Sequence, residues 1–154
     1  TEVSPNITMT RGMLVTVLYR MNGSPSVSGK TPFTDVRTDE WYSAAVLWAY
    51  QNGIVTGMSD TTFAPINNVT REQMATILFR YTKTAAPDKA KASADLSGFA
   101  DAGSVNDWAV DAMRWAVGQK LIAGITLGQS VYLQPRGNAT RAQAATVLTR
   151  YYAQ

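Results

Sequence analysis

The chain has 154 residues, of which 45% are hydrophobic and 16% charged, and its formal net charge is +3. This composition excludes an intrinsically disordered chain. The sequence contains neither Cys nor His, which excludes the usual nucleophile–base pairs and transition-metal ligand sets. No apolar run approaches the roughly 18 residues that a membrane helix needs. The mild positive charge, without a Lys/Arg run, favours an acidic polymer over nucleic acid as a partner.

A twelve-residue pattern occurs three times along the chain. It reads MTRGMLVTVLYR at 9–20, VTREQMATILFR at 69–80 and ATRAQAATVLTR at 139–150. In every copy a Thr-Arg pair is followed, nine residues after its Arg, by a second Arg; the pairs are Arg11/Arg20, Arg71/Arg80 and Arg141/Arg150. Three copies at fixed internal spacing indicate a repeat protein.

Each copy predicts a short amphipathic helix that begins after its Thr. Thr70 and Thr140 are good N-caps, because a hydroxyl can accept a hydrogen bond from an amide of the first turn. Gln73 and Gln143 stand three residues later and complete a capping box. The first copy has Met13 at that position, so its helix start is expected to be less well tied.

An Arg at the start of each helix is unusual. The N-terminal end carries a partial positive charge, so a cation there is unfavourable by about 0.3–1 kcal/mol. Three such arginines require a compensating anion. Physical chemistry leaves two interpretations open: a structural ion pair with an Asp of the same protein, or an anion site for a ligand formed by the Arg and the helix amides.

The repeats divide the chain into five segments. We predict the second half of a first repeat at 1–21, a connector at 22–32, a complete second repeat at 33–82, a linker or loosely held segment at 83–98 and a third repeat at 99–154. The first half of repeat one is missing. Either the chain was cut before this point, or another polypeptide supplies that half. Units of this size must pack on one another to bury their helix faces.

A tryptophan pattern precedes the Thr-Arg helix in repeats two and three. Trp41, Ala45 and Trp48 are spaced as one stripe of a helix, and Trp108, Ala112 and Trp115 repeat that spacing. Such a stripe is more often core than a ligand platform. We therefore expect one Trp of each pair in the core and the other at the edge of a groove.

Glycines mark the end of this predicted helix. Gly53 suits the left-handed residue that ends many helices, and Lys120 takes the equivalent position in repeat three. Gly57 and Gly124 occupy equivalent places in the following loop, where they either let a ligand approach the backbone or only serve a turn.

The ordered string F-x-D-V, W-Y-x-x-A-V-x-x-A, G-I-V-x-G, F-x-P and V-T-R-E-Q-x-A-x-I-L-x-R closely resembles the S-layer homology (SLH) domain. The resemblance covers nearly the whole chain. It implies an all-helical fold in which three repeats pack as a pseudo-threefold prism around a central bundle, with the prism open where repeat one is incomplete. It also implies an extracellular module that anchors a bacterial surface protein to the cell wall.

The resemblance further implies that grooves between repeats bind an anionic, for example pyruvylated, secondary cell-wall polysaccharide. The family's Thr-Arg-Ala-Glu signature contributes its Arg, a role that falls here to Arg71, Arg141 and, less surely, Arg11. Gln73, Gln143 and Met13 stand where the family has Glu, so the sites carry more positive charge than the family pattern.

Further candidates for ligand contact are the two aromatic and two acidic side chains that recur before the Thr-Arg helix. These are Trp41, Trp108, Asp35 and Asp101. For the two Asp residues, we favour capping of the following turn or pairing with an Arg over bonds to sugar hydroxyls.

Neither a catalytic role nor a cofactor or metal site is expected. The carboxylate pairs Asp107/Asp111 and Asp39/Glu40 do not recur at equivalent repeat positions, so they do not indicate a glycosidase. Asp60 alone does not make a calcium site. The alternative to wall anchoring is a protein–protein assembly module of a surface layer. A wall hydrolase is a third and weaker hypothesis.

Overall fold

The computed structural model describes residues 7–153, so residues 1–6 of the predicted half-repeat lie outside the described part of the chain. The chain forms two compact units. Unit 1 contains Ile7, Thr8 and residues 70–153, and unit 2 contains residues 9–69. Each unit therefore joins the Thr-Arg helix of one predicted repeat to the body of the next.

Unit 2 contains two packed helices, α1 (Arg11–Met21) and α2 (Ser43–Gln51). The two helices meet through Tyr19 and Trp48, whose ring centroids are 5.7 Å apart. Leu14, Leu18 and Phe63 are fully buried around this contact. Burial of such side chains contributes about 1.5–3 kcal/mol each, so the α1–α2 contact belongs to the core of the unit.

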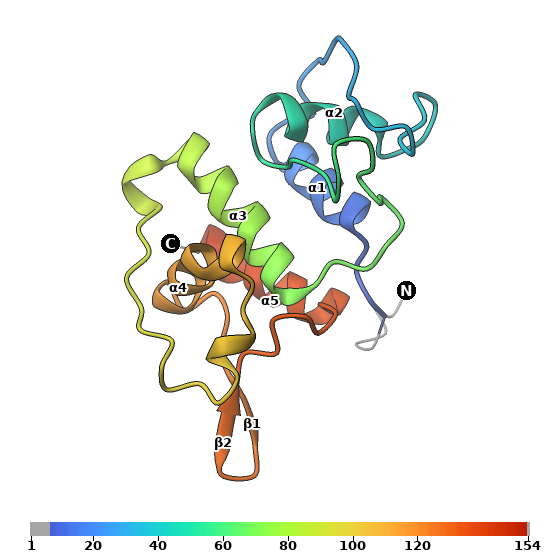
Figure 1. Ribbon diagram of the computed structural model, residues 1–154. Helices are drawn as coiled ribbons and strands as arrows, with labels where there is room; N and C mark the ends of the chain where they lie inside the picture. The colour runs from blue at the N-terminus through green and yellow to red at the C-terminus, as the bar shows by residue number, and fades with distance from the viewer. Residues whose placement is uncertain (1–6, 154) are drawn as a thin grey trace. The chain divides into compact units, whose positions relative to one another are not determined.

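Unit 1 contains the remaining elements (Figure 1). Its α-helices are α3 (Arg71–Ala85), α4 (Val110–Gly118) and α5 (Arg141–Tyr152), and its 3₁₀ turns are η1 (Pro87–Lys89), η2 (Ala102–Ser104) and η3 (Asp107–Ala109). Phe79 of α3 packs on Trp115 of α4 with ring centroids 5.5 Å apart. Thr82 of α3 and Tyr151 of α5 share a 2.9 Å hydrogen bond. The α3–α4 contact thus repeats the α1–α2 contact of unit 2.

The three Thr-Arg helices begin where the sequence predicts. The hydroxyls of Thr70 and Thr140 accept from the amides of Gln73 and Gln143, and both capping boxes are complete. Thr10 accepts from the amide of Met13, whose side chain has no oxygen with which to complete the box. The start of α1 therefore lacks one hydrogen bond, because Met13 cannot accept from the Thr10 amide as Gln73 accepts from the Thr70 amide.

The predicted Trp-Ala-Trp stripe is wrong in one respect. Trp41 precedes α2 and Trp108 lies in η3, so the first Trp of each pair is not on the α-helix of its partner. The expectation of one core Trp per pair is confirmed, because Trp48 and Trp115 are buried while Trp41 and Trp108 are 57% and 53% exposed. Helical spacing failed here because the backbone turns before the α-helix begins.

The predicted equivalence of Gly53 and Lys120 is confirmed. Both residues follow the C-cap of their helix in the left-handed conformation, with φ of 71° for Gly53 and 60° for Lys120. A left-handed backbone costs a non-glycine residue about 1–2 kcal/mol. Repeat three therefore keeps the turn at an energetic cost that repeat two avoids.

The fold is mostly helical, but a short hairpin was not predicted. Strands β1 (Ile125–Leu127) and β2 (Ser130–Tyr132) pair antiparallel, with Ile125 opposite Tyr132 and Leu127 opposite Ser130. The hairpin lies in the loop where repeat three is longer than repeat two. An isolated two-stranded hairpin has little stability of its own, so this one depends on the unit that carries it.

The 83–98 segment is held more firmly than the predicted loose linker. Its first residues extend α3, and the indole Nε1 of Trp115 donates to the Lys89 carbonyl at 2.8 Å. The Arg114 Nε donates to the Ala94 carbonyl at 2.8 Å, and Leu96 is buried. These contacts attach the segment to α4 along its course. No helix in residues 7–153 is long and apolar enough to span a membrane.

Loss of a capping box should destabilise unit 1. We expect Thr70→Ala to lower the free energy of unfolding by about 1 kcal/mol, because an amide of the first turn loses its acceptor. Thr84→Ala, at an exposed position near the end of the same helix, is the control and should change stability by less than about 0.5 kcal/mol. Urea unfolding followed by circular dichroism measures both. Equal effects of the two substitutions would contradict the assignment.

Candidate ligand-binding sites

The start of α3 is joined to the loop of repeat three by the Arg71 side chain. Its Nε donates to the Leu133 carbonyl at 2.8 Å and its Nη2 to the Ala123 carbonyl at 3.1 Å. The side chain is 6% exposed. Burial lowers the pKa of the Arg71 guanidinium, and the nearby Asp101 carboxylate opposes that shift. The guanidinium thus ties two repeats together inside unit 1.

Arg11 occupies the corresponding place in unit 2. Its Nε donates to the Phe63 carbonyl at 2.8 Å, and its guanidinium lies 4.7 Å from the centroid of the Phe63 ring. A guanidinium over an aromatic face gains a cation–π contribution of about 0.5–2 kcal/mol. Arg11 is 5% exposed. The two sites therefore share one design, although unit 2 has an aromatic side chain where unit 1 has Leu133.

The backbone amides at the start of α3 are occupied. The amides of Arg71 and Glu72 donate to the carbonyls of Gly137 and Pro135 at 2.9 Å. The next two amides donate to the hydroxyl and the carbonyl of Thr70. An anion site built from the helix amides is therefore wrong for α3. The alternative, compensation by an Asp of the same protein, is met through space: the bonds described for Arg71 go to carbonyls, while burial lowers the pKa of its guanidinium and the nearby Asp101 carboxylate raises it.

Asp35 and Asp101 hold the loops that receive these arginines. Asp101 accepts from the amides of Leu133 and Gln134 at 2.7 and 2.8 Å. Asp35 accepts from the amides of Phe63 and Ala64 at 2.9 and 2.8 Å. They do not cap the following turn as expected. Instead each carboxylate accepts from two successive backbone amides that lie about 30 residues away in sequence.

One residue in each loop links the carboxylate to the guanidinium. Leu133 donates its amide hydrogen to Asp101 and accepts from Arg71 at its carbonyl. The next residue, Gln134, has a φ of 49°, and its counterpart Ala64 in unit 2 has a φ of 59°. Backbone strain of this kind persists only where neighbouring groups impose it. The Asp carboxylate supplies that constraint by binding the strained residue's amide.

Gly57 and Gly124 each make room for the Phe that precedes these Asp residues. A Cβ on Gly57 would lie 2.5 Å from a ring carbon of Phe33, and one on Gly124 would lie 2.7 Å from a ring carbon of Phe99. Real Cβ atoms do not approach so closely. Both glycines therefore have a packing reason, and their role toward a ligand stays a prediction.

Arg141 begins α5 in unit 1. Its amide donates to the Ile7 carbonyl at 2.7 Å, and Thr140 pairs with Thr8 as Thr70 pairs with Asn138. Arg141 is more exposed than Arg11 and Arg71. The third helix start thus repeats the backbone pairing of the second, with an Arg that is half-buried as a residue and buried at its Nε atom.

Glu72 is a site residue that sequence reasoning missed. It is 2% exposed, and its two carboxylate oxygens accept from the backbone amide and the side-chain amide of Asn106 at 3.0 and 2.5 Å. Asn106 lies two residues before the exposed Trp108. In unit 2 the equivalents are Gly12, which has no side chain, and Asp39, so this bond cannot form there. Comparing these two positions between repeats could have found the interaction.

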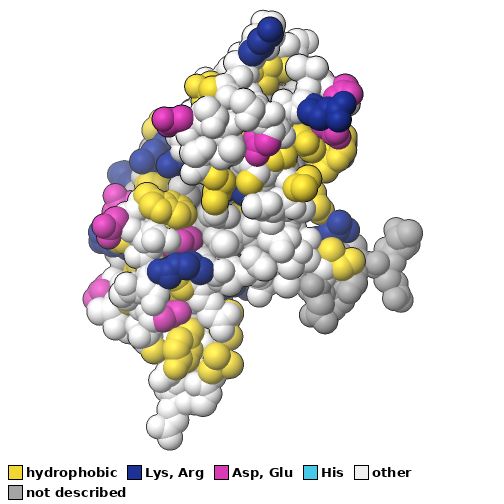
Figure 2. All heavy atoms as spheres, turned by 45° about the vertical axis from the view of Figure 1, so that its right-hand side comes forward, with side chains coloured by type: hydrophobic (Ala, Val, Ile, Leu, Met, Phe, Trp, Pro, Cys, Tyr) yellow, Lys and Arg dark blue, Asp and Glu magenta, His cyan; other side chains and the backbone are white. Residues whose placement is uncertain are grey.

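The charged side chains form no single patch on the face drawn in Figure 2 and no metal cluster among the described residues. Cationic and anionic side chains are interspersed on the face drawn in Figure 2. Within residues 7–153 no three acidic side chains gather as a metal site would require. The accessible candidates for ligand contact are therefore the exposed Trp side chains and the edges of the arginines.

The family model of the S-layer homology domain matches residues 32–75 and 98–145. The chain belongs to the S-layer homology domain family. SLH domains are non-catalytic modules that attach proteins to the cell wall and bind cell-wall polysaccharide in general, and they place this chain at the bacterial cell surface. The predicted family and location are thus confirmed.

The SLH chain matches short regions of much larger proteins. It is 34% identical over 149 residues to an endoglucanase of Bacillus sp. (strain KSM-635), covering 97% of this chain and 15% of that protein. It is 35% identical over 122 residues to the surface-layer 125 kDa protein of Lysinibacillus sphaericus, covering 79% and 10%. It is also similar to an amylopullulanase of Thermoanaerobacterium thermosulfurigenes, with 31% identity over 96% and 8%.

Among solved structures, an undecaheme cytochrome from the S-layer of Carboxydothermus ferrireducens aligns with a TM-score of 0.49 and 21% identity, over 99% of this chain and 22% of that one. The chain thus spans 8–15% of the three curated relatives named above.

Removing an Asp anchor should loosen its loop. We expect Asp101→Asn to lower the free energy of unfolding by about 1–3 kcal/mol, because the amide group offers one acceptor to two amide hydrogens. Asp35→Asn should behave alike. The exposed Asp60→Asn is the control and should be close to neutral. Chemical unfolding measures all three, and a neutral Asp101→Asn would overturn the role of the carboxylate.

A methyl group at Gly124 should disturb the Phe99 packing. We expect Gly124→Ala to cost about 1–3 kcal/mol of stability through overpacking. Gly103→Ala is the matched control, because a Cβ there meets nothing within 4 Å. Differential scanning calorimetry would compare their melting temperatures. A lower melting temperature for Gly103→Ala than for Gly124→Ala would contradict the packing assignment.

Proposed function

We propose that this SLH chain anchors its parent protein by binding an anionic, for example pyruvylated, secondary cell-wall polysaccharide in grooves between repeats. The carrying observation is the arrangement at the start of α3. Arg71 sits there beside Glu72, which holds Asn106 and thereby fixes the backbone two residues from Trp108. A cation and an exposed aromatic ring are thus attached to the same end of one helix.

The proposed roles differ between the side chains. Because Arg71 and Arg11 are only 6% and 5% exposed, a carboxylate would reach only the edge of either guanidinium. Trp108 and Trp41 are 53% and 57% exposed, and an exposed aromatic ring suits the apolar face of a sugar ring. Arg141, with its greater exposure, suits a bidentate carboxylate contact. The Asp and Gly residues support these groups by holding the loops.

Wall binding should depend on the exposed tryptophans. We expect Trp41→Ala with Trp108→Ala to reduce co-sedimentation with purified sacculi by about tenfold or more, since burying an aromatic side chain against a ligand contributes about 1.5–3 kcal/mol and each step of about 1.4 kcal/mol is a factor of ten. Ile66→Ala, at a residue that is 74% exposed, is the matched control and should bind normally. Both variants should stay folded, because the removed side chains lie largely in solvent.

Acid extraction removes the secondary polysaccharide from the sacculi and so tests whether the protein binds it. Binding that disappears after extraction, and weakens in Arg141→Ala, supports the proposal. Binding that persists after extraction would contradict it and favour a protein partner. The pseudo-threefold prism that the family resemblance implies stays a prediction, which small-angle scattering of the protein can test.

The second candidate function is assembly with other proteins of a surface layer. The favouring observation is the hairpin of unit 1, where Leu127 is 54% and Val131 36% exposed. Exposed apolar side chains on strands can pair with another chain. If Leu127→Ser with Val131→Thr abolishes wall association while the Trp variant retains it, assembly is the better explanation.

A further inference from the structure

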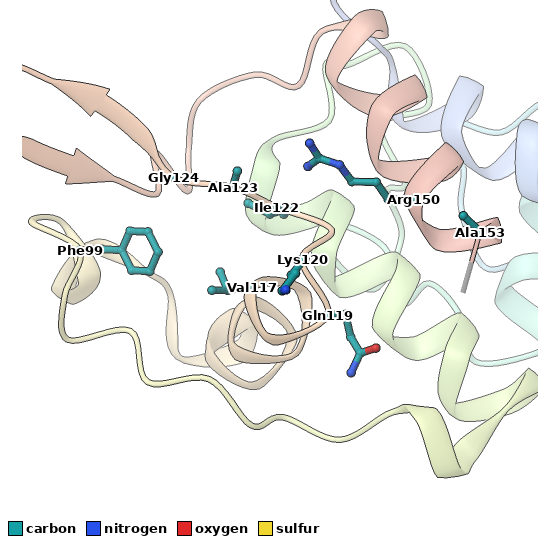
Figure 3. A pocket seen from close by; sticks show the side chains of 9 residues that line it. All are labelled: Phe99, Val117, Gln119, Lys120, Ile122, Ala123, Gly124, Arg150 and Ala153. Carbon is teal, nitrogen blue, oxygen red and sulfur yellow. The ribbon is translucent and has the colours of Figure 1, made fainter.

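Cationic side chains other than Arg71 gather in unit 1 beside the loop that receives the Arg71 side chain. A cleft of about 650 Å³ opens between the end of α4, the loop that follows it and the last turn of α5. Figure 3 shows its lining side chains. Lys120 and Arg150 contribute two cations, Gln119 contributes an amide, and Phe99, Val117 and Ile122 form an apolar wall. No acidic side chain lines the cleft.

Arg150 is the second Arg of the repeated pattern, which the proposed anchoring site leaves unused. It reaches from α5 toward the loop after α4, as Figure 3 shows, and its Nη1 is 3.5 Å from the Leu121 carbonyl. That distance is at the limit of a hydrogen bond. Arg150 is exposed and lines the cleft, and the planar fork of its guanidinium suits a carboxylate.

Lys120 provides an independent observation. It adopts the left-handed φ of 60° at a position where repeat two uses Gly53. A Lys elsewhere in the last turn of α4 could interact with the helix dipole without this backbone conformation. Strained non-glycine residues gather at functional sites. The Lys side chain at this turn puts a second cation on the rim of the cleft that Arg150 also lines.

We propose that this cleft binds a carboxylate-bearing sugar, with Lys120 and Arg150 on the carboxylate, Gln119 on a hydroxyl and Phe99 against the ring. The inference rests on the proposed function, because it adds a second contact for the same kind of anionic glycan. The cleft adjoins the site at α3, because the carbonyl of Ala123, which lines the cleft, also accepts from Arg71. It adds Lys120, Arg150 and Gln119 to that site. We also expect repeat three to bind such a sugar better than repeat two, whose equivalent position is Gly53.

Lys120→Gly separates binding from folding. Glycine adopts the left-handed turn without strain, so this variant should unfold at the same or a higher urea concentration than the unmodified protein. Its affinity for a carboxylate sugar should nevertheless fall by about tenfold or more, as expected when one charged hydrogen bond is lost. Arg150→Gln should lower the affinity similarly. Lys91→Ala removes an exposed cation outside the cleft and is the charge-matched control.

The probe is the methyl glucoside that carries a 4,6-linked pyruvate ketal, with its methyl ester as the uncharged control. Titration is followed by ¹⁵N-resolved NMR. We expect the acid to shift the amides of Gln119–Gly124, the ester to shift none of them, and Lys91→Ala to respond as the unmodified protein does. Equal affinity of Lys120→Gly, or shifts confined to the start of α3, would overturn the inference.

Parallel sacculus binding distinguishes this inference from the anchoring function. If the cleft variants bind sacculi and the ketal as the unmodified protein does, the cleft inference fails and anchoring stands. If the unmodified protein fails to bind sacculi while the ketal still shifts the cleft amides in a Lys120-dependent way, anchoring fails and the cleft stands as a carboxylate-sugar site.

Discussion

The structure depends on a short relay of hydrogen bonds that is present once in each unit. In unit 1 the Asp101 carboxylate holds the Leu133 amide, and the Leu133 carbonyl receives the Arg71 Nε. In unit 2 Asp35, Phe63 and Arg11 make the same chain. Hydrogen bonds to charged groups contribute about 1.5–3 kcal/mol each. The relay therefore compensates for the strain of the loop and fixes a cation at the start of a helix.

This relay explains why the repeated Arg tolerates its position. A cation at a helix N-terminus is unfavourable when it faces the helix dipole alone. Here the guanidinium donates to carbonyl oxygens of the neighbouring repeat, and each carbonyl oxygen carries a partial negative charge. The Asp carboxylate binds the same stretch of backbone and holds the carbonyl in place. The same contact joins the Thr-Arg helix of one repeat to the body of the next. The Arg that the family resemblance links to ligand binding therefore also holds two repeats together.

The sequence predicted what depends on local pattern and repetition. Thr70 and Thr140 cap their helices as expected because capping needs only residues three positions apart. Lys120 was matched to Gly53 by counting along the repeat. Contacts between distant residues were less accessible. Asp35 was assigned to a local turn, since nothing in a single sequence shows that its partners lie 28 and 29 residues away. Trp41 was placed on a helix because spacing alone cannot show where a helix begins.

The repeats differ from one another at a few positions that change a contact or a charge. Glu72 and Asn106 are bonded in unit 1 at positions where unit 2 has Gly12 and Asp39. The Asp39 side chain is an acceptor and cannot donate as the Asn106 side-chain amide does. The Glu–Asn bond is therefore a feature of the junction in unit 1 that the junction in unit 2 lacks. Lys120 in place of Gly53 adds a charge to the same repeat that has the Glu72 bond. Repeat three thus differs from repeat two both in how its body is held and in the charge that it presents at the end of its first helix.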